Sequence, residues 1–209
     1  MDKINDIEIK PLGKSNFITP LRMQYTQNGV KKIWDLIRIH NSVCIIIFNT
    51  TRKVLVFVKQ FRPAVYFAGI PDKDRQTTID TVKYPPEQGI TIELCAGIVD
   101  KNVSLEEIAR IEVLEECGYD VPVSKLERII SYRSGIGVCG DNQTLFYAEV
   151  TDNMKVGKGG GNLEEGEYIE TVEMTIPEAK KYLSKGVVLS PGGLLFGLLW
   201  FLQNKANTC

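Results

Sequence analysis

Two long apolar runs dominate the first third of the chain. Residues 42–48 and 53–58 are rich in β-branched and aromatic side chains and are separated by a short polar stretch. Continuous apolar runs of this length are typical of buried β-strands. Ahead of them, Asn28 and Gly29 interrupt an extended stretch over residues 21–40. An Asn-Gly pair favours a tight hairpin because both residues tolerate positive φ, so we predict a small N-terminal β unit.

The rest of the chain mixes strand-like and helix-like patterns. A helix is predicted over residues 104–117, where Ser104 and Glu107 give the S-x-x-E capping pattern and Gly118 a C-terminal stop. The other predicted elements are a loop over residues 71–90, strands over residues 91–96, 128–133, 143–150 and 167–174, and helices over residues 177–185 and 194–204. This order predicts a layered domain of mixed α+β or α/β class rather than a doubly wound parallel sheet.

Length and charge restrict the classes of protein. The chain has 209 residues, of which 44% are hydrophobic, enough for one domain over residues 41–209 preceded by a β unit over residues 1–40. The 25 basic residues nearly balance the 26 acidic ones. We therefore expect no nucleic-acid partner and no membrane-surface partner, since both favour a basic excess. The apolar run 194–202 is too short to span a bilayer, so it is predicted to be a buried or interface helix.

Cysteine usage bears on the cellular compartment. The five cysteines are an odd number, and none are spaced as C-x-x-C. This pattern argues against structural zinc and against a secreted disulfide framework. No apolar stretch follows the charged N-terminus, so we expect no signal peptide. Reduced thiols in the cytoplasm are the simpler interpretation.

The predicted helix 104–117 carries acidic residues where a packing helix would be apolar. At about 100° per residue, Glu112 and Glu116 continue the apolar stripe that begins at Leu105, and Glu115 lies at its margin. Two carboxylates four residues apart repel each other by roughly 0.2–0.5 kcal/mol on an exposed helix, and by more when they are buried without a cation. A hard divalent ion, Mg²⁺ or Mn²⁺, would compensate this repulsion. The alternative is a solvated acidic face.

Residues 97–119 resemble the Nudix box, whose family pattern is G-x5-E-x7-R-E-u-x-E-E-x-G-u, with u a bulky apolar residue. Seven constrained positions agree with the pattern, namely Gly97, Glu112, Val113, Glu115, Glu116, Gly118 and Tyr119. Val103 stands where the family has Glu, and Ile111 where it has the Arg that orients the carboxylates. Residues 58–66, 93–97 and 160–167 are similar to the nucleoside-diphosphate-sugar branch, which includes the animal UDP-sugar diphosphatases and the ADP-ribose pyrophosphatases.

The resemblance implies an α/β/α sandwich, a cytoplasmic homodimer, and an N-terminal unit that contributes to dimerisation and substrate binding. It also implies Mg²⁺-dependent hydrolysis of nucleotide sugars, with UDP-glucose giving UMP and glucose 1-phosphate and ADP-ribose as a second substrate. The implied metal ligands are Glu112, Glu116 and the Ala96 carbonyl, with Glu115 as a ligand or a supporting catalytic group. The base that activates water comes from an acidic loop after the box in related enzymes. That loop matches Glu165 as first choice and Glu167 as second.

Other residues are candidates for substrate binding, each with a plainer alternative. Arg62 ends an apolar strand and could hold a phosphate, or could form a surface ion pair. Trp34 and Tyr66 could stack on a base or sugar, or could belong to the core. Glu93 could bind substrate hydroxyls, or could be a charge at a sheet edge. The glycines between positions 157 and 161 could let the acidic loop close as a lid, or could be ordinary loop residues.

Two further functions stay open at this point. The first is a catalytically weak or inactive Nudix-fold module that binds a nucleotide sugar, because Val103 and Ile111 depart from the box. The second is a hydrolase of another diphosphate, such as a dinucleoside polyphosphate or coenzyme A, for which no additional motif is present.

Overall fold

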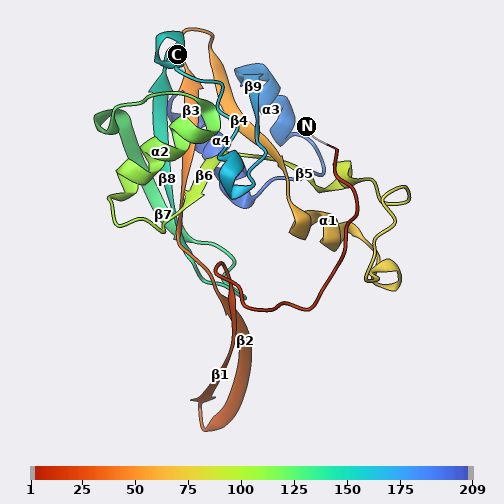
Figure 1. Cartoon of the computed structure of the whole chain (residues 1–209). Coiled ribbons are helices and arrows are strands. Elements are labelled where there is room, and N and C mark those ends of the chain that lie inside the picture. Colours follow the sequence, from red (N-terminus) through yellow and green to blue (C-terminus); the bar gives the residue numbers. More distant parts are fainter. Residues whose placement is uncertain (1–2, 207–209) are drawn as a thin grey trace.

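The computed structural model describes residues 3–206, and of Glu165 only the backbone. A mixed sheet runs in the order β5-β4-β3-β8-β7, with β6 also paired to β3 and β9 to β4 (Figure 1). Its strands are β3 (Ser42–Asn49), β4 (Val54–Phe61), β5 (Ile90–Glu93), β6 (Cys95–Ile98), β7 (Leu126–Arg133), β8 (Asn142–Val150) and β9 (Glu170–Thr175). β3 and β8 are parallel and the other pairs are antiparallel. This mixed sheet confirms the predicted α+β class.

Helices cover both faces of the sheet. α2 (Leu105–Cys117) covers one face, and α3 (Ile176–Leu183) and α4 (Gly192–Asn204) cover the other, whereas α1 (Pro63–Gly69) packs in a separate small cluster. Short 3-10 turns complete the list: η1 (Asp72–Asp74), η2 (Pro86–Gly89), η3 (Val123–Lys125), η4 (Asp152–Met154) and η5 (Leu163–Glu165). Alternate residues of β3 serve the two layers, as the period of a strand requires. Val43 and Ile45 pack with α2, whereas Ile46 and Phe48 pack with α3 and α4. The result is the expected sandwich.

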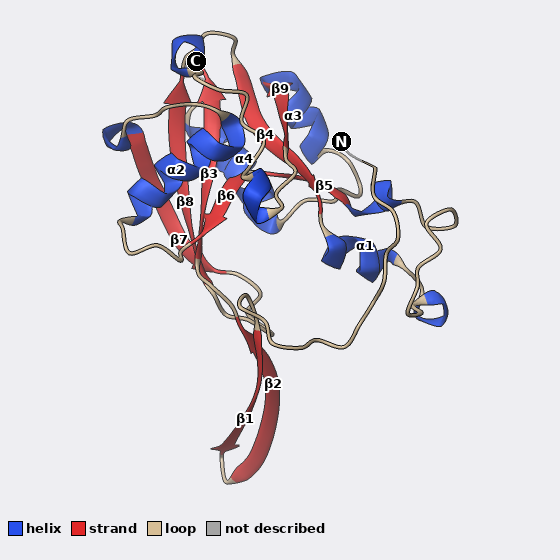
Figure 2. Ribbon diagram, viewed as in Figure 1, coloured by secondary structure: helices blue, strands red, loops and turns tan. Residues whose placement is uncertain are grey.

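The N-terminal hairpin forms a separate two-stranded sheet of β1 (Thr19–Gln27) and β2 (Val30–Arg38). Figure 2 shows it projecting from the body of the molecule. Asn28 and Gly29 have φ of 53° and 77°, which confirms the predicted turn, because a two-residue turn of this kind needs positive φ at both positions. Met23 and Trp34 face each other across the two strands, and 53% of each residue is exposed.

The structure confirms the predicted N-cap and C-terminal stop of helix α2. Ser104 Oγ accepts a hydrogen bond from the Glu107 amide at 3.1 Å, and Gly118 ends the helix with φ of 70°. The reciprocal half of the capping box is replaced, since the Glu107 carboxylate accepts two hydrogen bonds from Arg110 instead. The N-cap bond is the half that fixes where the helix begins.

Two predicted segments differ from the structure, and one helix was not predicted. The single strand expected over residues 91–96 is split at Leu94, because β5 pairs with β4 and β6 with β3. The strand expected to begin at residue 167 begins at Glu170, since η5 occupies the residues just before the loop returns. Helix α1, with Pro63 at its first turn, was not predicted; its seven residues are too short for a periodic pattern.

The apolar segment predicted as a buried or interface helix is α4. Leu194, Leu198 and Phe201 are buried against the sheet, whereas Leu199 is 58% exposed. Within residues 3–206, none of the helices combines the length and apolar character needed to cross a membrane.

Candidate active site

A cleft of about 740 Å³ opens where β3, β4 and β6 meet α2 and the first turn of α4. Six carboxylates line it, from Glu93, Asp100, Glu112, Glu115, Glu116 and Glu167. Arg62 and Lys101 supply positive charge to the same lining. The structure thus brings the acidic residues of the box, the β6 segment and the loop before β9 to one place. Such a concentration of negative charge is suited to a cation or to a ligand carried by one.

Glu116 is the most deeply placed of these acids, with 3% of the residue exposed. One carboxylate oxygen accepts a hydrogen bond from the Ala96 amide at 2.9 Å. Burial raises the pKa of Glu116 to about 8, because a charged carboxylate loses hydration there; the Ala96 hydrogen bond acts in the opposite direction but does not compensate. Helix α2 therefore directs this acidic side chain inward, as predicted.

Glu112 lies one turn earlier on α2, against the backbone of β6. A Cβ atom on Gly97 would lie 2.0 Å from Glu112 Oε1, so the close approach requires glycine at position 97. Burial raises the pKa of Glu112 to about 7, with further contributions from the charges of Glu115 and Glu167. Lys101 partly opposes this rise. Among the described residues, neither Glu112 nor Glu116 has a salt-bridge partner.

The carboxylate oxygens of Glu112 and Glu116 have the chemistry of ligands for a hard divalent cation. Across residues 3–206, no three histidine, cysteine or acidic side chains are gathered into a preformed metal-binding cluster. Two partly or fully buried carboxylates without a salt-bridge partner nevertheless have raised pKa values, which shows that the site favours added positive charge. Oxygen donors of this type are the ligands of Mg²⁺ and Mn²⁺. The buried oxygens of Glu112 and Glu116 therefore suit an ion of this class.

Arg62 and Glu93 form a two-pronged ion pair at one end of the cleft. The guanidinium donates from Nε and Nη2 to the two carboxylate oxygens, each at 2.7 Å, and Thr91 Oγ1 donates to Glu93 Oε1 at 2.6 Å. Burial acts to raise the pKa of Glu93, but the hydrogen bonds and charge of Arg62 outweigh it, so the pKa is lowered. The pair remains charged within the cleft lining.

The acidic loop before β9 places Glu167 in the cleft. The Asn162 amide donates to Glu167 Oε2 at 3.0 Å. Glu165 belongs to η5, and its side chain lies outside the described part of the chain. The preceding Gly160 and Gly161 donate their amides to the Glu116 and Glu115 carbonyls at 3.0 and 3.1 Å. The loop is therefore packed on the end of α2.

Two aromatic candidates lie outside the cleft lining. Tyr66 is 2% exposed, packs with Ile70 and Ile79, and donates its hydroxyl to the Tyr84 carbonyl. This is the core environment that was its alternative interpretation, and we exclude it from the proposed substrate contacts. Trp34 lies on the projecting hairpin and donates Nε1 to the Gly137 carbonyl at 2.9 Å.

Sequence reasoning missed two polar residues of the cleft lining on the α4 side, Ser42 and Gln143, and the tyrosine bonded to Gln143. Tyr132, Gln143 and Ser42 lie in register on β7, β8 and β3. The Tyr132 hydroxyl donates to Gln143 Oε1, and Gln143 Nε2 donates to Ser42 Oγ at 3.1 Å. Gly193 of α4 lets the helix approach, since a Cβ there would lie 2.4 Å from the Tyr132 hydroxyl. Only strand register brings these residues together, so no sequence motif marks them.

Comparison with known proteins identifies the family of the chain. No family model matches the chain. The chain is 41% identical to the uridine diphosphate glucose pyrophosphatase NUDT14 of Bos taurus and 39% identical to that of Mus musculus, in each case over 97% of this chain and 96% of the relative. It is also 34% identical to the GDP-mannose pyrophosphatase of Escherichia coli K12, over 79% of this chain and 74% of the relative. With the box helix at the cleft, this likeness shows that the chain belongs to the Nudix hydrolase family, in the branch of the animal UDP-sugar pyrophosphatases.

Proposed function

We propose that the protein hydrolyses the diphosphate bond of nucleoside diphosphate sugars. UDP-glucose and water would give UMP and glucose 1-phosphate, and ADP-ribose would be a second substrate. The observation that carries the proposal is the inward placement of Glu112 and Glu116 beside Ala96 and Gly97, in an acidic cleft large enough for such a ligand. The relatives named for UDP-glucose support the choice of substrate.

A divalent metal, which Nudix pyrophosphatases generally require, completes this proposal. We assign Mg²⁺, with Mn²⁺ as a substitute, to the carboxylates of Glu112, Glu115 and Glu116 and to the Ala96 carbonyl. When bound, the ion supplies positive charge for the diphosphate and lowers the pKa of a coordinated water. Without that charge, the six carboxylates would repel a diphosphate, which carries two negative charges of its own.

The remaining steps belong to side chains of this chain. Glu165 or Glu167 would take the proton from the attacking water, and Glu167 already lies in the cleft lining. The outer part of the Arg62 guanidinium, whose side chain is 45% exposed, would hold a phosphate oxygen. Glu93 would fix the orientation of Arg62 and bind sugar hydroxyls at the same end. These contacts would orient the substrate for attack on phosphorus.

We further propose a cytoplasmic homodimer that joins through the N-terminal hairpin. One face of the hairpin presents apolar side chains, from Leu21, Met23, Tyr25, Val30, Trp34 and Leu36. A lone two-stranded sheet is marginally stable, so this face needs a covering surface. A second copy would supply it and could carry Trp34 toward a neighbouring cleft. The four described cysteines are free, three of them buried, which suits a reducing compartment.

The dimer can be tested with two neighbouring hairpin residues that point to opposite faces. Met23→Lys places a charge on the apolar face, whereas Ile33→Lys places it on the other face, and both residues are more than half exposed. We expect Met23→Lys alone to produce monomers in analytical ultracentrifugation. Dimers that persist in both variants would rule out this interface.

A binding module without turnover is the second candidate, because Ile111 and Val103 replace the Arg and the first Glu of the box. Purified protein should be incubated with UDP-glucose and with ADP-ribose, with and without Mg²⁺, beside Glu116→Gln. The hydrolase proposal expects metal-dependent UMP and glucose 1-phosphate, lost in Glu116→Gln and retained in Glu106→Gln, a change on the same helix outside the cleft lining. Ligand binding without products at every metal concentration would establish the module instead.

A further inference from the structure

The glycine stretch Gly159–Gly161 closes the C-terminal end of α2. The last four carbonyls of a helix lack partners within it. Here the Gly118 amide donates a hydrogen bond to the Leu114 carbonyl, and the Lys155 ammonium donates one to the Cys117 carbonyl at 2.7 Å. The other two are those of Glu115 and Glu116, which accept from the Gly161 and Gly160 amides. The two glycines are therefore tied to the backbone of the residues that carry the acidic side chains of the cleft.

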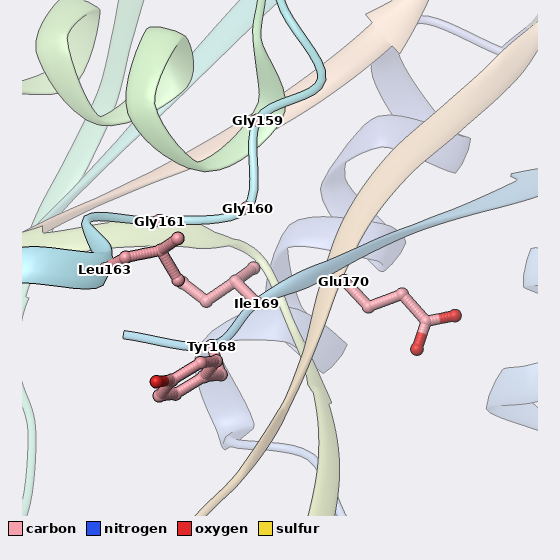
Figure 3. A pocket seen from close by; sticks show the side chains of 7 residues that line it. All are labelled: Gly159, Gly160, Gly161, Leu163, Tyr168, Ile169 and Glu170. Carbon is pink, nitrogen blue, oxygen red and sulfur yellow. The ribbon is translucent and has the colours of Figure 1, made fainter. Parts of the chain in front are cut away.

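The opposite edge of the same stretch holds the segment that carries Glu167. The Ile169 amide donates to the Gly160 carbonyl at 3.0 Å, and the Glu167 amide donates to the Asn162 carbonyl at 3.1 Å. The Asn162 amide returns a hydrogen bond to the Glu167 carboxylate. Figure 3 shows the glycine stretch running past Leu163 and Ile169, beside a hollow of about 360 Å³. The stretch thus lies between the helix end and the loop segment that carries Glu167.

Glycine is required at both ends of this stretch. Gly159 has φ of +70°, and a Cβ there would lie 2.2 Å from the Glu116 carbonyl oxygen. Gly161 has φ of +79°, and its Cβ would lie 2.8 Å from the Glu167 Cβ and 3.1 Å from both Glu167 Oε2 and Ile169 Cδ1. The separations of 2.2 and 2.8 Å are shorter than real Cβ contacts, and those of 3.1 Å are tight. Any side chain at position 161 would therefore displace Glu167 or the stretch itself.

We infer that Gly159–Gly161 is a positioning element for the hydrolytic reaction, which sets the Glu167 carboxylate relative to Glu115 and Glu116. This inference rests on the proposed function, and of the two candidate bases named there it takes Glu167 as the one that accepts the proton of the attacking water. The stretch acts as a fixed bridge between the helix and the loop, with hydrogen bonds on both edges. A general base displaced by about 1 Å loses much of its effect, so close placement of this kind matters for rate.

Two glycines of this loop provide a matched test. Gly161 and Gly166 have nearly equal φ, +79° and +78°, so alanine is placed at a left-handed φ at both positions. They differ in surroundings, because a Cβ on Gly166 would meet no described atom within 4 Å. We expect Gly161→Ala to lower kcat for UDP-glucose about tenfold to a hundredfold with KM within about threefold. Gly166→Ala should keep kcat within about twofold. Equal losses in the two variants would overturn the inference.

A double-mutant cycle separates positioning from general damage to the loop. If Gly161 acts through Glu167, then Gly161→Ala should lower kcat in the parent protein but not in Glu167→Gln, whose base is already absent. The same loss in both backgrounds would reject the inference. Full kcat in Glu167→Gln would reject Glu167 as the base, whereas the hydrolase proposal itself fails only if the parent protein gives no products.

Folding of the variants is checked by their thermal unfolding midpoints. If Gly161→Ala does not fold, Gly161→Asn replaces it in the cycle, because asparagine occupies the left-handed region more readily and still brings a Cβ against Glu167. The same kcat loss is expected from it, and a kcat equal to that of Gly166→Ala would contradict the inference.

Discussion

Gly97 and Glu112 fit together so closely that a methyl group on Gly97 would overlap the Glu112 carboxylate, at 2.0 Å from both Cδ and Oε1. The overlapping atoms are the far end of a flexible side chain, so Gly97→Ala should be tolerated by the fold and should displace the carboxylate. We expect a free energy of unfolding within about 1 kcal/mol of the parent and affinity for Mn²⁺ lowered about tenfold or more. Calorimetric titration measures the affinity. Gly186→Ala, where a Cβ meets no described atom within 4 Å, should leave both quantities unchanged.

The raised pKa values of Glu112 and Glu116 predict how pH affects the metal-free protein. Their folded values, about 7 and about 8, lie above the ordinary carboxyl value of 4.5, so the folded state binds these protons more tightly than the unfolded state. The resulting stability is complete below about pH 4.5 and is lost as pH rises through 7 to 8. Urea unfolding in the presence of EDTA should therefore give a lower free energy of unfolding at pH 8 than at pH 6.

The same carboxylates predict that metal and protons compete. Mg²⁺ should raise the thermal unfolding midpoint more at pH 8 than at pH 6, because the ligands must lose their protons to bind it. In the double variant Glu112→Gln/Glu116→Gln, both the pH dependence and the metal effect should be strongly reduced. A parent protein whose stability without metal does not change between pH 6 and pH 8 would contradict the burial of these charges.

A charge placed at Gln143 should change substrate affinity without breaking the local hydrogen bonds. In Gln143→Glu, Tyr132 and Ser42 can both donate to the new carboxylate, so the local hydrogen bonds persist. The added negative charge in the cleft should repel a diphosphate and raise KM for UDP-glucose about tenfold, with a smaller effect at high salt. Steady-state kinetics at two ionic strengths test this. Gln88→Glu, which adds the same charge outside the cleft lining, should leave KM unchanged.

Local features of the fold were predictable at positions where a residue type strongly favours one local structure, such as a tight turn or a helix end. Asn28 and Gly29 marked the hairpin, and Ser104 and Gly118 marked the ends of α2. The acidic stripe was also visible, because helical period places Glu112 and Glu116 on the packing side whatever the tertiary fold. These are short-range rules, and the structure confirms the elements they predicted.

Features that depend on strand register could not be read from the sequence. Leu94 separates two strands because β5 pairs with β4, whereas β6 pairs with β3. Gln143 reaches the cleft because β8 pairs in parallel with β3, far away along the chain. Tyr66 closes a segment that resembles the nucleotide-sugar branch of the family, yet α1 directs its side chain into a small apolar cluster. In each case a long-range contact decided the placement.

The Arg62–Glu93 pair allows its structural and functional roles to be separated. Arg62→Met leaves a Glu93 carboxylate that is only 8% exposed without its cation, so we expect a loss of about 1–3 kcal/mol in the free energy of unfolding. Adding Glu93→Gln removes the unpaired charge and should restore most of that stability. If Arg62 also holds a substrate phosphate, the double variant should regain stability but keep a KM for UDP-glucose raised at least tenfold. Urea unfolding and steady-state kinetics on the same samples give both quantities, and a double variant with parental KM would show that the pair serves the fold alone.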